Sequence, residues 1–182
     1  MASQTVATYQ FYTYDVVATQ ADSYLSFTFR NDPAYTSLDT ISVTLSGGPE
    51  LLLNGGMDTA TADVPDNWVK IGTQGLAAAG IYSTTSPPGI GPQAGAGYWR
   101  DGAVGGFDGI AQSLTTTIGA TYTISFWLGG NPLFNSTDVQ SYAYFGALPP
   151  GLIILSGALP ATHWLGQTDS NWRATNWASD ST

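Results

Sequence analysis

The sequence predicts an all-β protein, an antiparallel β-sandwich of the jelly-roll type. Apolar and polar residues alternate with a period of two along most of the chain, which is typical of strands that bury one face. Helical periodicity is nearly absent, and the alanine-rich stretch 76–79 is long enough for one helical turn at most. The 22 glycines and 10 prolines concentrate between the alternating runs, where the turns of a sandwich would lie.

The clearest strands are four alternating runs, at 12–19, 24–29, 37–45 and 122–128. In the last run, Ile124 and Phe126 share the core-facing side, which places Trp127 on the opposite face. Trp127 is therefore expected to face water or to be covered by the tail or a neighbour. In the third run the alternation is ambiguous, because either Thr40 or Ile41 could continue the inward series. We expect each of these strands to have one face in the core and one face in water.

Length and composition bound the possible functions. A chain of 182 residues predicts a single domain, and a hydrophobic share of 43% is sufficient for a core. Charged residues make up only 9%, against about 25% in ordinary domains. Lys and Arg number four and the net charge is −9, which excludes an ordinary nucleic-acid binder and argues against docking on anionic membranes.

Few residues are available for catalysis. The chain has no cysteine, which excludes thiol chemistry, thiolate metal sites and disulfides. Its one histidine, His163, is not in a nucleophile motif of the kind that a hydrolytic triad uses. The twelve aspartates and one glutamate could supply a carboxylate pair for glycoside hydrolysis. Most of them, however, lie in turn-like contexts such as 31–33 and 65–67. The sequence therefore predicts a protein that is not an enzyme.

No segment predicts membrane insertion or classical export. The longest apolar stretch, 151–159, is too short and too interrupted by glycine and proline to span a bilayer. The polar N-terminus lacks the charged and apolar regions of a secretory signal. We therefore expect either a protein that is released by a route other than classical secretion, as virion proteins are, or a processed segment of a longer chain.

Two segments carry a recognisable pattern: LLLNGGMD at 51–58, and the run from DGIAQSL at 108–114 to YTISFWL at 122–128. They resemble the opening two-thirds of bacterial galactose-binding-like jelly rolls, the fold of many carbohydrate-binding modules and surface domains. The segments that resemble the closing strands of that family, within 14–43, come first in this chain.

The resemblance covers 9–46 and 51–129 and implies a circular permutation joined at 47–50. One sandwich domain, 1–182, would then consist of closing strands (1–46), the opening motif and central strands (51–129), and late strands with a Trp-rich tail (130–182). Alternatively, the first segment completes the sandwich of a neighbouring molecule. The resemblance implies function weakly, because such folds host many roles.

The resemblance also implies a structural calcium site. Family members often hold calcium near the opening motif and the closing strand, and the matching residues here are Asp58 and Asp39. The family has a glutamate where this chain has Asp58, which is shorter by one methylene. The alternative is that both carboxylates bind loop amides.

A sugar site is predicted in the longest loop, 83–106, which carries Tyr98, Trp99, Arg100 and Asp101. Aromatic rings stack on sugar faces, while arginine and aspartate bind the hydroxyls. The alternative is that Trp99 packs over a sheet edge. By its place after the opening motif, Trp68 is expected to be structural.

Assembly is the function that the composition favours most. Sheet edges are commonly protected by lysine, and this chain has only Lys70. The tail carries Trp164, Trp172 and Trp177, and such aromatics are enriched at protein interfaces. We expect a non-enzymatic structural or display protein that self-associates or joins a larger assembly, such as a decoration subunit of a virion or of another extracellular surface. The alternative is a lectin-like glycan-binding module.

Overall fold

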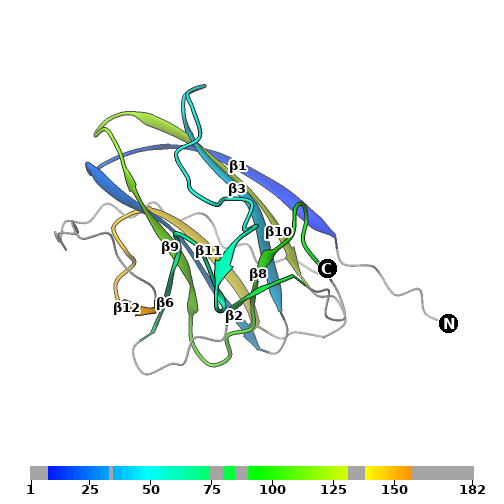
Figure 1. Ribbon diagram of the computed structural model, residues 1–182. Helices are drawn as coiled ribbons and strands as arrows, with labels where there is room; N and C mark the ends of the chain where they lie inside the picture. Colours follow the sequence, from blue (N-terminus) through cyan, green and yellow to red (C-terminus); the bar gives the residue numbers. More distant parts are fainter. Residues whose placement is uncertain (1–7, 33–34, 74–79, 85–89, 131–137, 157–182) are drawn as a thin grey trace, which may run out of the picture.

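The computed structural model describes residues 8–32, 35–73, 80–84, 90–130 and 138–156, and within these ranges it contains strands and no helix (Figure 1). The strands are β1 (Tyr9–Val17), β2 (Asp22–Asp32), β3 (Thr36–Leu45), β4 (Ala60–Thr61), β5 (Val64–Pro65), β6 (Val69–Thr73), β7 (Ile81–Ser83), β8 (Tyr98–Asp101), β9 (Asp108–Thr115), β10 (Thr121–Gly130), β11 (Asp138–Gly146) and β12 (Leu152–Ser156). The alanine-rich stretch 76–79 lies outside the described residues.

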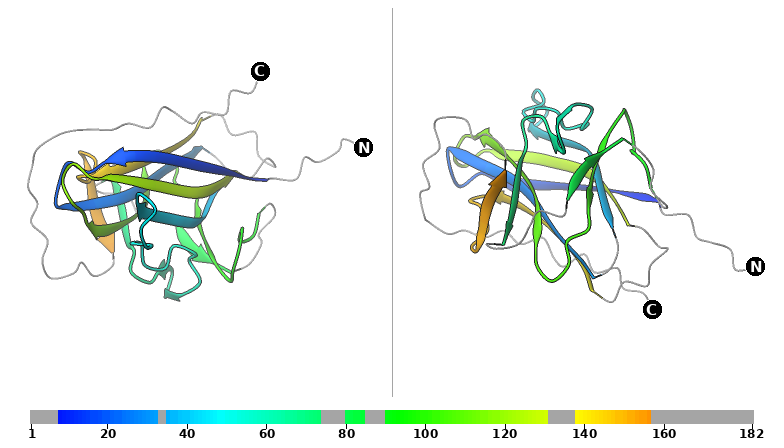
Figure 2. Two further views of the ribbon diagram at one scale, coloured as in Figure 1. Left: turned by 90° about the horizontal axis from the view of Figure 1, so that it is seen from above. Right: turned by 60° about the horizontal axis from the view of Figure 1, so that its bottom comes forward.

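The strands form two five-stranded sheets that pack face to face. The first sheet has the order β1-β10-β3-β8-β7 and the second has the order β11-β2-β9-β6-β12. Every pairing is antiparallel, and β4 and β5 form a separate small hairpin. Figure 2 shows the two layers from two further directions. The predicted all-β antiparallel sandwich is confirmed.

Alternating apolar residues from both sheets meet in one core. The Phe27 and Phe126 rings contact each other edge to face across the two sheets, with centroids 4.9 Å apart. Trp68 packs against Phe27 at 6.5 Å and is 3% exposed, so it is structural as predicted. Such aromatic contacts add about 0.5–1.5 kcal/mol to the burial of the rings themselves.

A β-bulge resolves the ambiguous alternation in β3. Thr40 has a φ of 50°, and the register between β10 and β3 shifts by one residue beside it. The extra residue lets Leu38, Ile41 and Val43 all face the core, at 0%, 4% and 0% exposure. Ile41 therefore takes the inward position, and Thr40 is the inserted residue of the bulge.

The outer face of the second sheet is partly covered, so the expectation that each strand has one face in water is wrong for β2. Its outward-facing Tyr24 and Ser26 are 3% and 0% exposed. The connection 147–151 joins β11 to β12, which lie at opposite edges of this sheet. Leu148 of that connection packs on an outer cluster that contains Tyr24 and Ile71. A second, smaller apolar layer thus covers one end of this face.

Candidate functional site

The four residues predicted to form an exposed sugar-binding loop instead form the strand β8. The strand lies between β3 and β7 in the first sheet. Tyr98, Trp99 and Asp101 are each 0% exposed, and of the four only Arg100 is partly exposed. A ring without an exposed face cannot stack on a sugar. The expectation of an exposed aromatic loop at these residues is therefore wrong, and Trp99 is a core residue.

Asp101 and Asp108 form a buried carboxyl pair between the two sheets. Asp101 ends β8 in the first sheet, Asp108 begins β9 in the second, and both are 0% exposed. The indole N–H of Trp99 donates to Asp101 Oδ2 at 3.1 Å, and the amide N–H of Ala103 donates to Oδ1 at 3.1 Å. Asp108 Oδ2 accepts the amide N–H of Gly80 at 3.2 Å.

The surroundings of the pair favour a protonated Asp101. Burial raises the pKa of Asp101 well above its ordinary value, and the charge of Asp108 and a hydrogen bond between the two groups raise it further. A second charge beside Asp108 in a buried site would be costly, so Asp101 keeps its proton to a higher pH than an exposed aspartate does. Because neither group is exposed, the pair has no access to a substrate. Its geometry fits a structural role, in which it joins β8 to β9.

Lys70 lies over the same buried region. Its side chain points inward from β6 and is 5% exposed, and Nζ lies 5.7 Å from the centre of the Trp99 ring. Nζ also donates to Asp63 Oδ2 at 2.5 Å, and this bond lowers the pKa of Asp63. Gly80 packs directly against the Trp99 ring, and a Cβ at this position would collide with the ring. The only lysine of the chain is thus buried, and it does not protect an exposed sheet edge.

Sequence reasoning missed this cluster because its members come from separate strands. Asp101 and Asp108 are seven positions apart and belong to different sheets, so no local spacing brings them together. The one available signal was that Trp99 and Asp101 alternate at positions i and i+2, which places their side chains on the same face of a strand.

Asp39 and Asp58, the predicted calcium ligands, both bind the amides of one loop. Asp39 Oδ2 accepts the N–H groups of Gln93 and Ala94 at 2.7 and 3.1 Å. Asp58 Oδ1 accepts the N–H of Ala96 at 2.7 Å. This geometry is the alternative that the sequence left open, and calcium binding stays a prediction. In the part of the chain that the structure describes, no group of three or more His, Cys, Asp or Glu side chains could hold a metal.

We expect Asp39→Ala to lower the free energy of unfolding by about 1–3 kcal/mol, the cost of leaving partly buried donors without an acceptor. Its carboxylate also accepts the N–H of Thr40 at 2.6 Å, so three amides lose their acceptor. Burial nevertheless raises the pKa of Asp39 to about 6, and nearby Asp58 adds to this. Urea denaturation should give the same loss in calcium and in chelator. A loss that appears only in calcium would show that Asp39 acts through the ion.

The outer face of the first sheet is open along β1 and β10. We call this surface the open face; it consists of Phe11, Thr13, Asp15 and Val17 on β1, with Thr123, Ser125 and Trp127 on β10. The Phe11 ring contacts the Trp127 ring at 5.2 Å, which confirms the outward direction predicted for Trp127. Thr123 Oγ1 donates to Asp15 Oδ1 at 2.6 Å. Phe11 and Val17 are 50% and 56% exposed.

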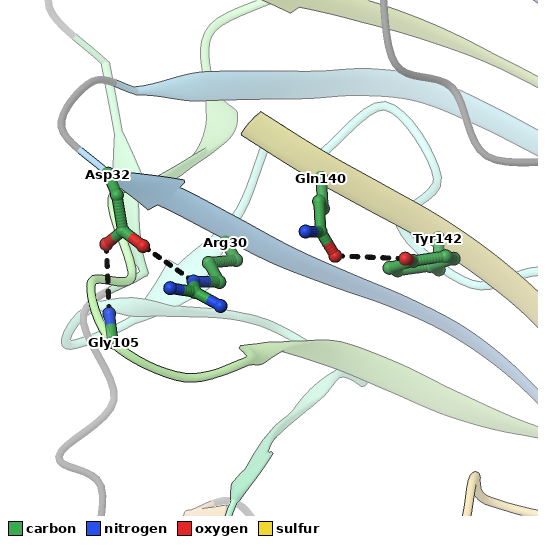
Figure 3. Close-up of polar contacts among 5 residues, drawn as sticks. All are labelled: Arg30, Asp32, Gly105, Gln140 and Tyr142. Atoms are coloured by element: carbon green, nitrogen blue, oxygen red, sulfur yellow. Dashed lines mark hydrogen bonds and ion pairs between the residues drawn. The ribbon is translucent and has the colours of Figure 1, made fainter. Parts of the chain in front are cut away.

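A polar and aromatic patch lies on β2, β11 and the loop before β9 (Figure 3). We call it the Arg30 patch; it consists of Arg30, Asp32, Phe107, Gln140 and Tyr142. Arg30 Nε donates to Asp32 Oδ2 at 2.6 Å, and Asp32 Oδ1 accepts an amide N–H from the neighbouring loop at 2.9 Å. Tyr142 donates its hydroxyl to Gln140 Oε1 at 3.0 Å and contacts the Phe107 ring at 5.5 Å. This set combines rings with amide, guanidinium and carboxylate groups.

Several predicted residues lie outside the described ranges. They are Trp164, Trp172 and Trp177, which were expected to contact neighbours, and His163. Within the described ranges, no helix has the length and apolar character needed to cross a membrane. Comparison with known proteins gives no family model, no curated protein and no solved structure that matches this chain.

Proposed function

We propose that this protein is a non-enzymatic structural or display subunit that associates with neighbours through the edge strand β1. Among the described residues no strand pairs with the outer edge of β1. This strand is nine residues long and lacks lysine, arginine and proline. Long edges of this kind are templates for pairing with another chain unless they are protected. This open edge, with Phe11 and Val17 exposed beside it, is the observation that carries the proposal.

The other sheet edges are better protected. β7 is only three residues long, and β12 pairs through an irregular register. β11 is as long as β1, but none of the residues 139–146 is exposed. The exposed apolar side chains and the long free edge therefore coincide only at β1 among the described strands.

The composition supports an assembly at a virion or another extracellular surface. Only 9% of the residues are charged, so most of the surface available for contacts is uncharged, although the net charge of −9 opposes association at low salt. The tryptophans of the segment 157–182 are the second surface proposed to contact neighbours. The resemblance to permuted galactose-binding-like jelly rolls fits this role, because that fold serves in many surface proteins. The two sheets could be completed within one chain or by strand exchange.

The role of β1 can be tested by placing a charge on it. We expect Phe11→Asp and Val17→Asp to weaken self-association at least tenfold, because each places a carboxylate in an apolar contact. Ile118→Asp is the matched control, since Ile118 is 66% exposed in the turn before β10. The measurement is the concentration dependence of the mass by sedimentation equilibrium. Equal effects of all three variants would show that β1 is not the contact surface.

A second candidate function, glycan binding, is favoured by the Arg30 patch. The rings of Phe107 and Tyr142 could stack on a sugar, while Arg30 and Gln140 bind its hydroxyls. On a broad glycan panel, we expect Tyr142→Ala to reduce binding about tenfold, or 1.4 kcal/mol. Tyr35→Ala, which removes a 41% exposed ring outside the patch, should leave binding unchanged. Absence of binding to every glycan, or equal losses in both variants, would refute this candidate.

A further inference from the structure

The outward side chains of β1 are arranged symmetrically about Tyr14. Phe11 and Val17 lie three residues to either side of it, and Thr13 and Asp15 lie one residue to either side. If two copies of this strand run antiparallel with Tyr14 opposite Tyr14, each apolar side chain faces an apolar one. Each threonine likewise faces a carboxylate. Directly opposed residues in antiparallel strands are the pairs that stabilise a sheet.

We propose that β1 pairs antiparallel with β1 of a second copy of this chain in that register, an inference that rests on the assembly role proposed above. The contact has two-fold symmetry, as closed dimers require. It joins the two first sheets into one continuous sheet. On the outer face, Phe11 contacts the partner's Val17 and Thr13 contacts the partner's Asp15. On the inner side, Tyr12 lies opposite the partner's Val16.

The hydrogen bonds of Asp15 agree with this register. Oδ1 already accepts the Thr123 hydroxyl, and within the described ranges no donor reaches Oδ2. Thr13 is exposed, and no described residue forms a hydrogen bond with its hydroxyl. In the proposed register the partner's Thr13 donates to Oδ2 of Asp15, just as Thr123 donates to Oδ1 within the chain. The dimer thus repeats across the contact a threonine–aspartate pair that the sheet already contains.

Other registers are less complementary. A shift that places Thr13 opposite Thr13 puts Phe11 against the partner's Asp15, so a carboxylate faces a ring, and Val17 lies opposite the partner's Tyr9 instead of Phe11. A shift that places Val16 opposite Val16 moves Phe11 beyond the end of the partner's β1. Registers that pair an even-numbered residue of one strand with an odd-numbered residue of the other would place the core-facing side chains of one strand on the outer face of the other.

The salt dependence of association follows from the net charge. Each chain carries a charge of −9, so two copies repel each other, and association is expected to be tighter at 0.5 M salt than at low salt.

Single cysteines test the register directly, because the chain has no cysteine of its own. Opposed Cα atoms in antiparallel strands lie about 4.5–5.5 Å apart, within disulfide range. We expect an oxidised mixture of Phe11→Cys and Val17→Cys proteins to give a covalent dimer on a non-reducing gel. Neither variant alone should give one, because two copies of residue 11 would lie about 20 Å apart. Both substituted residues are at least half exposed, so the fold should tolerate the changes.

The outcomes separate this inference from the assembly role itself. A mixture of Phe11→Cys and Asp15→Cys that forms the covalent dimer instead would show the Thr13-centred register and overturn the proposed one. No covalent dimer in any mixture, from a chain whose unaltered form is oligomeric, would overturn the β1 pairing and leave the assembly role standing. A monomeric unaltered chain would overturn both.

Discussion

Replacing Trp99 with alanine is expected to lower the free energy of unfolding by about 3–5 kcal/mol, the usual cost of removing a large buried aromatic side chain. The Trp99 ring is 0% exposed, so its loss leaves a cavity beneath Lys70 and removes the donor to Asp101 Oδ2. The loss should exceed a simple cavity effect, because that oxygen loses a hydrogen bond in a buried site. Urea denaturation followed by circular dichroism measures the change without relying on tryptophan fluorescence.

Trp127→Ala is the matched control for this substitution. It removes the same side chain from the open face, where the ring contacts Phe11 and is partly exposed. We expect a loss of about 1 kcal/mol or less, as for other surface substitutions with modest contacts. Equal losses at the two positions, or a stable Trp99→Ala protein, would contradict the assignment of Trp99 to the core.

Stability is expected to fall as the pH rises from about 4 toward neutrality. The folded chain holds the proton of Asp101 more tightly than an unfolded aspartate does, because the pKa of Asp101 is raised by burial and by Asp108. An unfolded aspartate titrates near pH 4, so the contribution is complete below that pH and is lost as the pH rises through the folded pKa. For each such group, the free energy of unfolding falls by up to about 1.4 kcal/mol for each unit by which the pH rises across this window.

Asp39 contributes in the same direction between about pH 4 and 6, because its pKa is raised to about 6. The part of the slope that Asp39 does not supply is therefore assigned to Asp101. Asp32 and Asp63 act in the opposite sense, because hydrogen bonds lower the pKa of each. Their contribution is present above about pH 4 and is lost as the pH falls below it.

Asp108→Asn measures how much of this pH dependence comes from the interaction of Asp101 with Asp108. The amide keeps the shape, accepts the Gly80 N–H and donates to Asp101 without carrying a charge, so the fall of stability with rising pH should have a shallower slope, while burial still raises the pKa of Asp101. Asp22→Asn, an exposed aspartate in β2, should leave that slope unchanged. Urea midpoints at half-unit pH steps measure both. An unchanged slope in Asp108→Asn would show that Asp108 does not raise the pKa of Asp101.

The alternation of side chains predicted most of the framework. The runs at 24–29, 37–45 and 122–128 lie within β2, β3 and β10, and the run at 12–19 overlaps β1, which ends at Val17. The outward direction of Trp127 followed from Ile124 and Phe126. These features depend on residues next to each other in one strand, which a sequence displays directly. Trp68 was likewise expected to be structural, and the structure buries it.

The features that the sequence did not predict depend on contacts between distant segments. Tyr98 and Trp99 carry side chains that suit a ligand or a core equally well, and only the position of β8 between β3 and β7 decides between them. The burial of Tyr24 depends on the path of residues 147–151, which no local pattern reveals. The open face could be recognised only once the strand order was known, because the pairing of Phe11 with Trp127 joins segments more than 100 residues apart.

The mass of the untagged chain in solution tests the central claim most directly. One chain has a mass of 19.1 kDa. Light scattering after size exclusion, at 0.5 M salt and over a range of concentrations, should give at least twice that mass, with dissociation on dilution. A mass that stays near 19 kDa at every concentration would contradict the claim that the exposed edge of β1 is an association surface.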